Sequence, residues 1–192
     1  MSKLETNTID TVSGTTNLTI GSTNTSSITL GASGDTITIP NGALTGQNYP
    51  AFYRVKTSNV SITNNTYTRV SFDTERFDTD NAMTSTTFTV PSGKAGKYFF
   101  HAACIVDANA LTQLSYINSR FYKNGSQVNN ILVDFRNNHV QQFNCQNTFI
   151  IDLVAGDYME LYIRGLDTSG NPSVNGSSAE DLTYFMGYRI GA

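Results

Sequence analysis

The sequence predicts an all-β protein in two parts, a thin N-terminal repeat stalk over residues 1–48 and a two-sheet sandwich or jelly-roll head over residues 49–192. Three observations predict this. Short apolar doublets recur every nine or ten residues in the first part. The second part has strand-length segments in which apolar and polar residues alternate between turn sequences. No stretch keeps an apolar period of 3.6 residues for more than a couple of turns.

The first part is a repeat of short strand pieces rich in Thr, Ser, Asn and Gly. Its apolar residues come in doublets two positions apart, which places both side chains on one face of a strand, and Gly or Pro follows each doublet at once. Units of this kind bury their apolar side only against copies of themselves. The doublets are Leu18/Ile20, Ile28/Leu30 and Ile37/Ile39, followed by Gly21, Gly31 and Pro40.

This predicted stalk needs other chains in order to fold. Its few aliphatic side chains cannot offset the ordering of so long a backbone segment, at ~1–2 kcal/mol for each residue. We expect three identical chains to wrap around one axis and to bring Ile20, Leu30 and Ile39 together in apolar layers. A Ser/Thr/Gly linker without fixed structure is the alternative, although such a linker has no need of evenly spaced doublets.

The second part has the pattern of half-buried antiparallel sheet, because apolar residues take every second position in its clearest strand segments. The apolar positions are Phe149, Ile151 and Leu153 in TFIIDL, and Met159, Leu161 and Ile163 in YMELYIR, where Tyr158, Glu160 and Tyr162 take the other face. Turn sequences such as KNGS, VAGD and SGNPSVNGSS separate the segments.

The composition excludes several classes of partner. The net charge is −3, only 14% of residues are charged, and no basic cluster occurs, so we expect no nucleic-acid partner. No segment approaches the ~20 apolar residues of a membrane span, and the N-terminus has no apolar signal sequence. We therefore expect synthesis in a cytoplasm without membrane insertion. Cys104 and Cys145 are expected to be buried thiols, and neither a metal site nor a cofactor is predicted.

Four sequence blocks follow one another through residues 51–190. They are TTFTVPSGKAGKYFF (Thr86 to Phe100), FYKNGSQV, IDLVAGDYMELYI and TYFMGYRI. In this order and spacing they resemble the Phe-x-x-Pro with Gly-x-Tyr-Phe-Phe, Lys-Asn-Gly, Leu-x-x-Gly-Asp and Phe-x-Gly motifs of one family. That family is the globular head of the complement first component's q subunit, whose fold is also that of the tumour necrosis factor head.

The resemblance implies a ten-stranded jelly roll that assembles as a tight homotrimer, with both termini at its base and a trimeric stalk. The family's collagen stalk is absent, and the β repeats stand in its place. Because the last strand then runs towards the base, the loop Asp167–Asp181 lies at the far tip, where we expect receptor contacts. Calcium, which some members bind, is not expected, because Phe143 stands at a ligand position. The candidate contacts are Asn171, Ser173, Asn175 and Asp181.

Tyrosines recur on the predicted strands, often opposite the aliphatic face. A row of this kind is unusual on the solvent side of a monomer and normal at a subunit interface. The set is Tyr116, Tyr122, Tyr158, Tyr162, Tyr184 and Tyr188, of which Tyr158, Tyr162, Tyr184 and Tyr188 are our candidates for the trimer interface.

No catalytic site is predicted. His101 falls within a predicted strand and is expected to pack in the core, and no Gly-x-Ser-x-Gly elbow occurs. Asp152 and Asp157 flank a turn, and Asp157 belongs to the Gly-Asp motif, so a turn role is expected rather than acid or base catalysis.

Together these expectations describe a virion fibre or spike of the phage tail or capsid type. Its N-terminus would bind other virion proteins, and its trimeric head would attach multivalently to a host glycan or envelope protein. The alternative is a capsid decoration or stabilising spike without a receptor. A secreted signalling ligand would need an export route, and a fibre depolymerase would need a groove lined by carboxylates.

Overall fold

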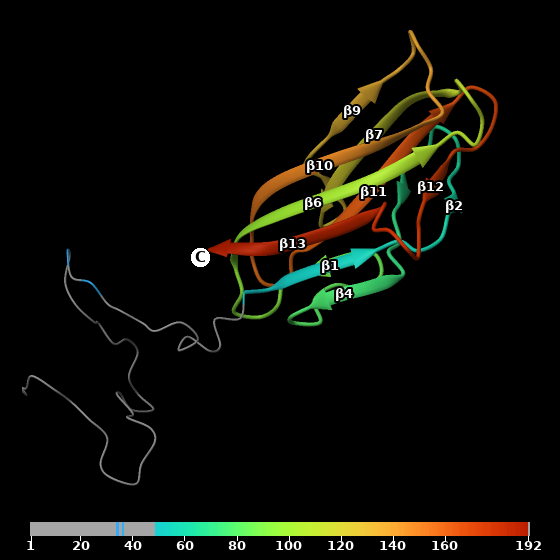
Figure 1. Ribbon diagram of the computed structural model, residues 1–192. Coiled ribbons are helices and arrows are strands. Elements are labelled where there is room, and N and C mark those ends of the chain that lie inside the picture. Colours follow the sequence, from blue (N-terminus) through green and yellow to red (C-terminus); the bar gives the residue numbers. More distant parts are fainter. Residues whose placement is uncertain (1–33, 35, 37–48, 192) are drawn as a thin grey trace, which may run out of the picture. The chain divides into compact units, whose positions relative to one another are not determined.

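The structure is a computed structural model that describes Gly34, Thr36 and residues 49–191. The predicted stalk, with Ile20, Leu30 and Ile39, lies outside the described residues and stays a prediction, as does its boundary with the head. Residues 49–191 fold as an antiparallel sandwich of two sheets (Figure 1). No helix occurs among the described residues, which confirms the all-β prediction for the head. Accordingly, none of them forms a helix able to cross a membrane.

The first sheet, sheet A, presents its full width to the viewer in Figure 1. Its strands are β1 (Ala51–Val55), β2 (Val60–Ser61), β4 (Thr74–Asp78), β6 (Gly96–Asp107), β10 (Gln142–Leu153), β12 (Ser173–Asn175) and β13 (Tyr184–Gly191). Across the sheet the order is β10, β6, β13, β1 and β4, all antiparallel. The short strands β12 and β2 continue the sheet at the end of β6 that β13 does not reach.

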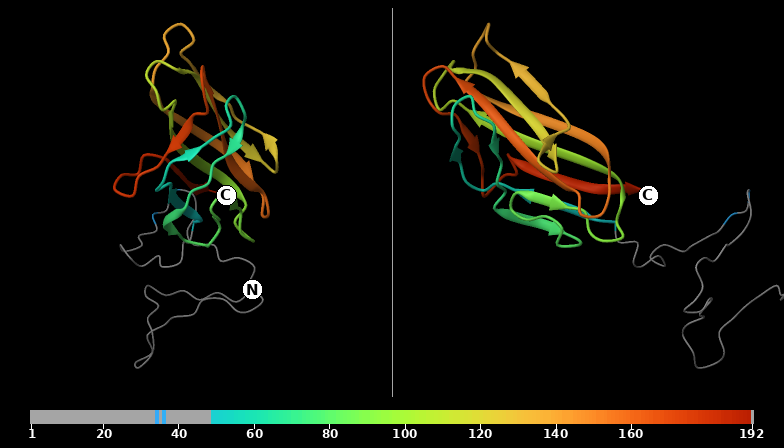
Figure 2. Two further views of the ribbon diagram at one scale, coloured as in Figure 1. Left: turned by 90° about the vertical axis from the view of Figure 1, so that its right-hand side faces the viewer. Right: turned by 180° about the vertical axis from the view of Figure 1, so that it is seen from behind.

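The second sheet, sheet B, packs behind the first. Its strands are β3 (Thr68–Arg69), β5 (Thr87–Thr89), β7 (Leu114–Lys123), β8 (Ser126–Gln127), β9 (Ile131–Asp134) and β11 (Tyr158–Asp167). Strand β11 pairs with β7 on one side and with β3 and β5 on the other, and β8 and β9 extend the sheet beyond β7. Figure 2 shows the molecule from the side and from behind, with β9 in gold at the outer edge.

Aromatic rings fill the space between the sheets. Phe52 packs on Phe88 and Phe185 with ring centroids 4.9 Å apart in both pairs, and Phe100 joins this group from β6. The alternation in β11 is confirmed, because Met159, Leu161 and Ile163 are fully buried in this core. Such rings bury a large apolar area, so they stabilise the sandwich without any disulfide. Cys104 and Cys145 are buried free thiols opposite one another on β6 and β10.

The head has thirteen strands over residues 49–191, where the resemblance implied ten. The difference comes from very short pieces, since β2, β3 and β8 are two residues long and β5 and β12 are three. Each is a brief pairing of a loop with a longer strand. The arrangement of the longer strands is consistent with the predicted jelly roll.

Strand β1 starts and β13 finishes at the same end of the sandwich, since Ala51 pairs with Tyr188. The segment leading from β11 into β12 lies at the opposite end (Figure 1). The far end of the head therefore carries this segment together with the loop between β6 and β7.

Candidate binding surfaces

The outer face of sheet A carries several exposed apolar side chains. Residues that alternate with buried ones point away from the core. In β6, Phe99 and His101 alternate with the buried Tyr98, Phe100 and Ala102. The register places Tyr188 of β13 and Ile150 of β10 on either side of Phe99.

We call this surface the apolar face and define it by Phe77, Phe99, Ile150, Met186 and Tyr188. Ile150, Phe77 and Tyr188 are 56%, 48% and 42% exposed, and Phe99 and Met186 are partly buried. The rings of Phe99 and Tyr188 lie 5.1 Å apart. Apolar side chains exposed on one face of neighbouring paired strands are typical of a protein-protein interface.

A polar row crosses the apolar face beside Phe99. Nδ1 of His101 lies 2.8 Å from the hydroxyl of Thr148, and its Nε2 lies 3.0 Å from the hydroxyl of Tyr184. Burial lowers the pKa of His101 below its ordinary value. The expectation that His101 packs in the core is wrong, because its ring lies on the outer side of sheet A, where it contacts Tyr184.

The structure separates the four candidate interface tyrosines. Tyr184 and Tyr188 lie on the outer side of sheet A, whereas Tyr158 and Tyr162 lie on the outer side of sheet B, opposite the buried face of β11. The four do not form one surface. Sequence reasoning missed Phe99 and Ile150, although KYFFH carries a signal: consecutive aromatic residues in one strand must point to both faces.

Two of the predicted tip residues hold the end of the sandwich together. Ser173 is buried, and its hydroxyl lies 3.2 Å from Oδ1 of Asn109 and 2.8 Å from Oδ1 of Asn175. Nδ2 of Asn175 in turn donates to Asp107. Asn171 is exposed, and its Oδ1 accepts a hydrogen bond from the backbone N–H of Asn64. Of these three, only Asn171 is an exposed residue.

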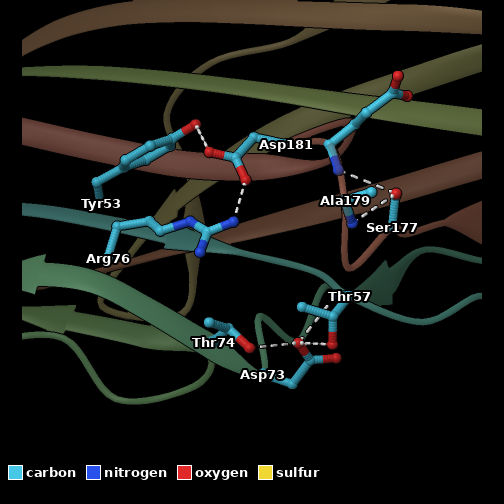
Figure 3. A network of polar contacts seen from close by, with 9 residues as sticks. Tyr53, Thr57, Asp73, Thr74, Arg76, Ser177, Ala179 and Asp181 are labelled. Atoms are coloured by element: carbon cyan, nitrogen blue, oxygen red, sulfur yellow. Dashed lines mark hydrogen bonds and ion pairs between the residues drawn. The ribbon is translucent and has the colours of Figure 1, made fainter.

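Asp181, the fourth tip candidate, ties the segment before β13 to β1 and β4. One carboxylate oxygen accepts from the hydroxyl of Tyr53 at 2.8 Å, and the other pairs with Arg76 at 2.5 Å (Figure 3). These contacts with Arg76 and Tyr53 lower the pKa of Asp181. The pKa of Tyr53 is raised to about 12, first by burial and then by the Asp181 carboxylate. The same view shows Asp73 bound by Thr57 and Thr74.

Hollows also lie elsewhere on the described part of the head. One, of about 590 Å³, follows β9 and is lined by residues 134–138 and Val140. Its carboxylate, Asp134, pairs with Arg136. Another, of about 200 Å³, lies between β2 and β3 and contains the buried Lys56 beside apolar residues. Neither lining contains the pair of carboxylates that glycoside hydrolysis uses.

Solved structures of other proteins share the fold of the head. The globular domain of zebrafish complement 1qA protein aligns with a TM-score of 0.53 at 14% identity, covering 74% of this chain and 98% of that one. Murine APRIL at pH 5.0 aligns with a TM-score of 0.53 at 11% identity, covering 74% of this chain and 100% of that one. These likenesses confirm the predicted type of head fold and concern the fold alone. No family model and no curated protein matches the sequence.

Proposed function

We propose that the chain is the subunit of a homotrimeric fibre or spike, whose head attaches multivalently to a receptor or glycan on a host surface. The observation that carries the proposal is the apolar face of sheet A. A second copy of the same chain is the partner that we assign to it, since a head of this fold type is expected to assemble as a trimer. Three equivalent weak sites on one particle would then add up to firm attachment.

The fibre architecture draws its support from the sequence pattern of residues 1–48. Regular apolar doublets need neighbouring copies, and a trimeric head supplies three copies side by side. A phage-type tail or capsid fibre, anchored to other virion proteins through its N-terminus, is the setting that we propose for this combination. This setting rests on the sequence pattern alone.

One observation favours a second candidate, a capsid decoration or stabilising spike that binds no receptor. All four predicted contact residues make hydrogen bonds within the head, and Asn171 is the one exposed member of the set. Attachment of the purified trimer to intact host cells separates the two. A trimer that binds no host cell would support the structural role.

The trimer is tested by placing charge on the apolar face. We expect Ile150→Glu combined with Tyr188→Glu to convert a particle of about 63 kDa, three times 20.9 kDa, into monomers when mass is measured by light scattering. The reason is that a carboxylate buried without a partner at an interface costs several kcal/mol. Both residues neighbour Phe99 in the sheet register.

Leu111→Glu is the matched control, because Leu111 is 75% exposed in the loop between β6 and β7. It adds one carboxylate away from the apolar face, where the double variant adds two within it, and is expected to leave the trimer intact. A wild-type monomer, or a double variant that remains trimeric, would contradict the assignment of this face.

A further inference from the structure

We propose that the outer face of sheet B binds an acidic saccharide, whose carboxylate pairs with the guanidinium groups of Arg120 and Arg164. This inference rests on the proposed attachment function and names its ligand class. The proposed binding site lies on a sheet surface, and not in the distal loop that the sequence predicted. We call this surface the arginine-tyrosine face and define it by Tyr67, Tyr116, Tyr122, Tyr162, Arg120 and Arg164.

Tyrosine rings hold both guanidinium groups in place. The Cζ atoms of Arg120 and Arg164 lie 3.9 Å and 4.5 Å from the centroid of one ring, that of Tyr67, and Arg164 also lies 4.9 Å from the ring of Tyr116. A guanidinium stacked on a ring keeps its N–H edges available for planar acceptors. The stacking therefore orders the two arginines without using up their donors.

Most of these donors have no acceptor in the head. Arg164 makes no hydrogen bond or ion pair within residues 49–191, and its Nε is buried without a partner. Nε of Arg120 donates to Oδ1 of Asn118 and of Asn130, at 3.1 Å and 2.8 Å. The terminal amino groups of both guanidinium groups have no acceptor among residues 49–191, and a bound carboxylate would supply one.

The charges on this side of the molecule do not balance. Glu160 of β11 is paired with Arg69 at 2.6 Å, and Asp134 of β9 is paired with Arg136 at 2.5 Å. Neither Arg120 nor Arg164 pairs with a carboxylate in the described part of the chain, so two positive charges remain on a protein of net charge −3. The complementary ligand carries negative charge.

The tyrosines specify the rest of the ligand. The ring centroids of Tyr122 and Tyr162 lie 4.4 Å apart on neighbouring strands. Both residues are partly exposed and lie beside Arg120. Rings with an apolar body and a hydroxyl fit a sugar, which offers a C–H face and hydroxyl groups. Arginine pairs with a carboxylate through two parallel hydrogen bonds. Nucleic acid fits less well, because two free guanidinium groups would neutralise only two phosphates.

The test uses the full chain and immobilised oligosaccharides that carry sialic or uronic acid, each beside its uncharged methyl ester. We expect binding to the free acids and not to the esters. Arg164→Gln should weaken binding to the free acids by about tenfold or more. Arg164→Lys should weaken it by less, because lysine keeps the positive charge but lacks the two parallel N–H donors of a guanidinium group. Arg120→Gln is a second variant in case Arg164→Gln fails to fold.

Arg76→Gln is the control for net charge, since Arg76 lies on β4 and pairs with Asp181. It should leave binding unchanged. Equal binding to acids and esters, absence of binding, unaltered binding by both Arg164→Gln and Arg120→Gln, or tighter binding to single-stranded DNA would each overturn the proposal. If an Arg164→Gln trimer still attaches to host cells, this site fails while the proposed attachment stands. If the wild-type trimer attaches to no host cell, the attachment itself fails.

Discussion

Gly187, in β13, lies directly against the aromatic core. A Cβ atom at this position would be 2.6 Å from Cδ1 of Phe100 and 2.8 Å from Cε1 of Phe52, closer than carbon atoms approach without displacement. Both rings are fully buried, so neither has room to move away. We expect Gly187→Ala to lower the free energy of unfolding by about 1–3 kcal/mol, measured by chemical denaturation.

Gly191→Ala serves as the control in the same strand, because a Cβ there meets nothing within 4 Å. Its effect should stay within about 0.5 kcal/mol. Equal losses for both variants would show that loss of glycine, and not the ring contact, sets the cost.

The sequence could mark Gly187 only as the glycine of a Phe-x-Gly motif. The reason for the glycine lies in Phe52 of β1 and Phe100 of β6, which reach it through pairing between strands that are distant in the chain. Glu160 is a similar case. Glu160 follows the buried Met159 in β11 and points to the other face, which predicts an exposed side chain. It is nevertheless buried, because Arg69 and Thr87 from two short strands bind its carboxylate.

The carboxylate of Asp157 makes several of the contacts that stabilise the hairpin between β10 and β11. Asp157 is buried and accepts hydrogen bonds from the backbone N–H of Val154 at 2.9 Å and from Nδ2 of Asn124 at 2.7 Å, and it pairs with Lys123 at 2.8 Å. Burial alone would raise the pKa of Asp157, but Lys123 and these hydrogen bonds lower it to about 2. The predicted turn role of Asp157 agrees with these contacts.

This hairpin should be sensitive to acid. The folded pKa of Asp157 is depressed, so its stabilisation is present above the ordinary value of 3.8 and is lost as pH falls towards about 2. We expect Asp157→Asn to cost about 1–3 kcal/mol near neutral pH, with a difference from wild type that shrinks through this range. Denaturation curves recorded at several pH values measure it.

Asp152→Asn is the control at the other end of the turn. Asp152 also forms an ion pair, with Lys97, but its side chain is 74% exposed, and exposed pairs contribute little. A pH-independent difference between wild type and Asp157→Asn would contradict the account of the turn.

At the scale of elements, alternation predicted which side of a strand is buried but not what the other side faces. Met159, Leu161 and Ile163 are buried as predicted, since that depends only on the local pattern. Tyr162 and Tyr188 could not be assigned to different sheets in this way, because sheet membership follows from long-range pairing. The strands of two or three residues could not be predicted either, because so short a segment shows no alternation of apolar and polar residues.

For the molecule as a whole, the head is expected to contain the surface that drives assembly. A chain that starts at Tyr49 should therefore still form a trimer by light scattering, because the apolar face lies entirely within residues 51–191. If only the full chain forms trimers, the assembly energy would lie in residues 1–48. If neither chain forms trimers, the proposal of a trimeric fibre is wrong.

The pairing of Ala51 with Tyr188 has a mechanical consequence. A head tethered at residue 49 and held at its opposite end would be pulled along the direction of β1. The hydrogen bonds of β1 to β13 and β4 run across this direction, so the residue pairs of the strand would share the load in shear instead of opening one after another. Strand order thus gives the head a preferred direction of resistance to force.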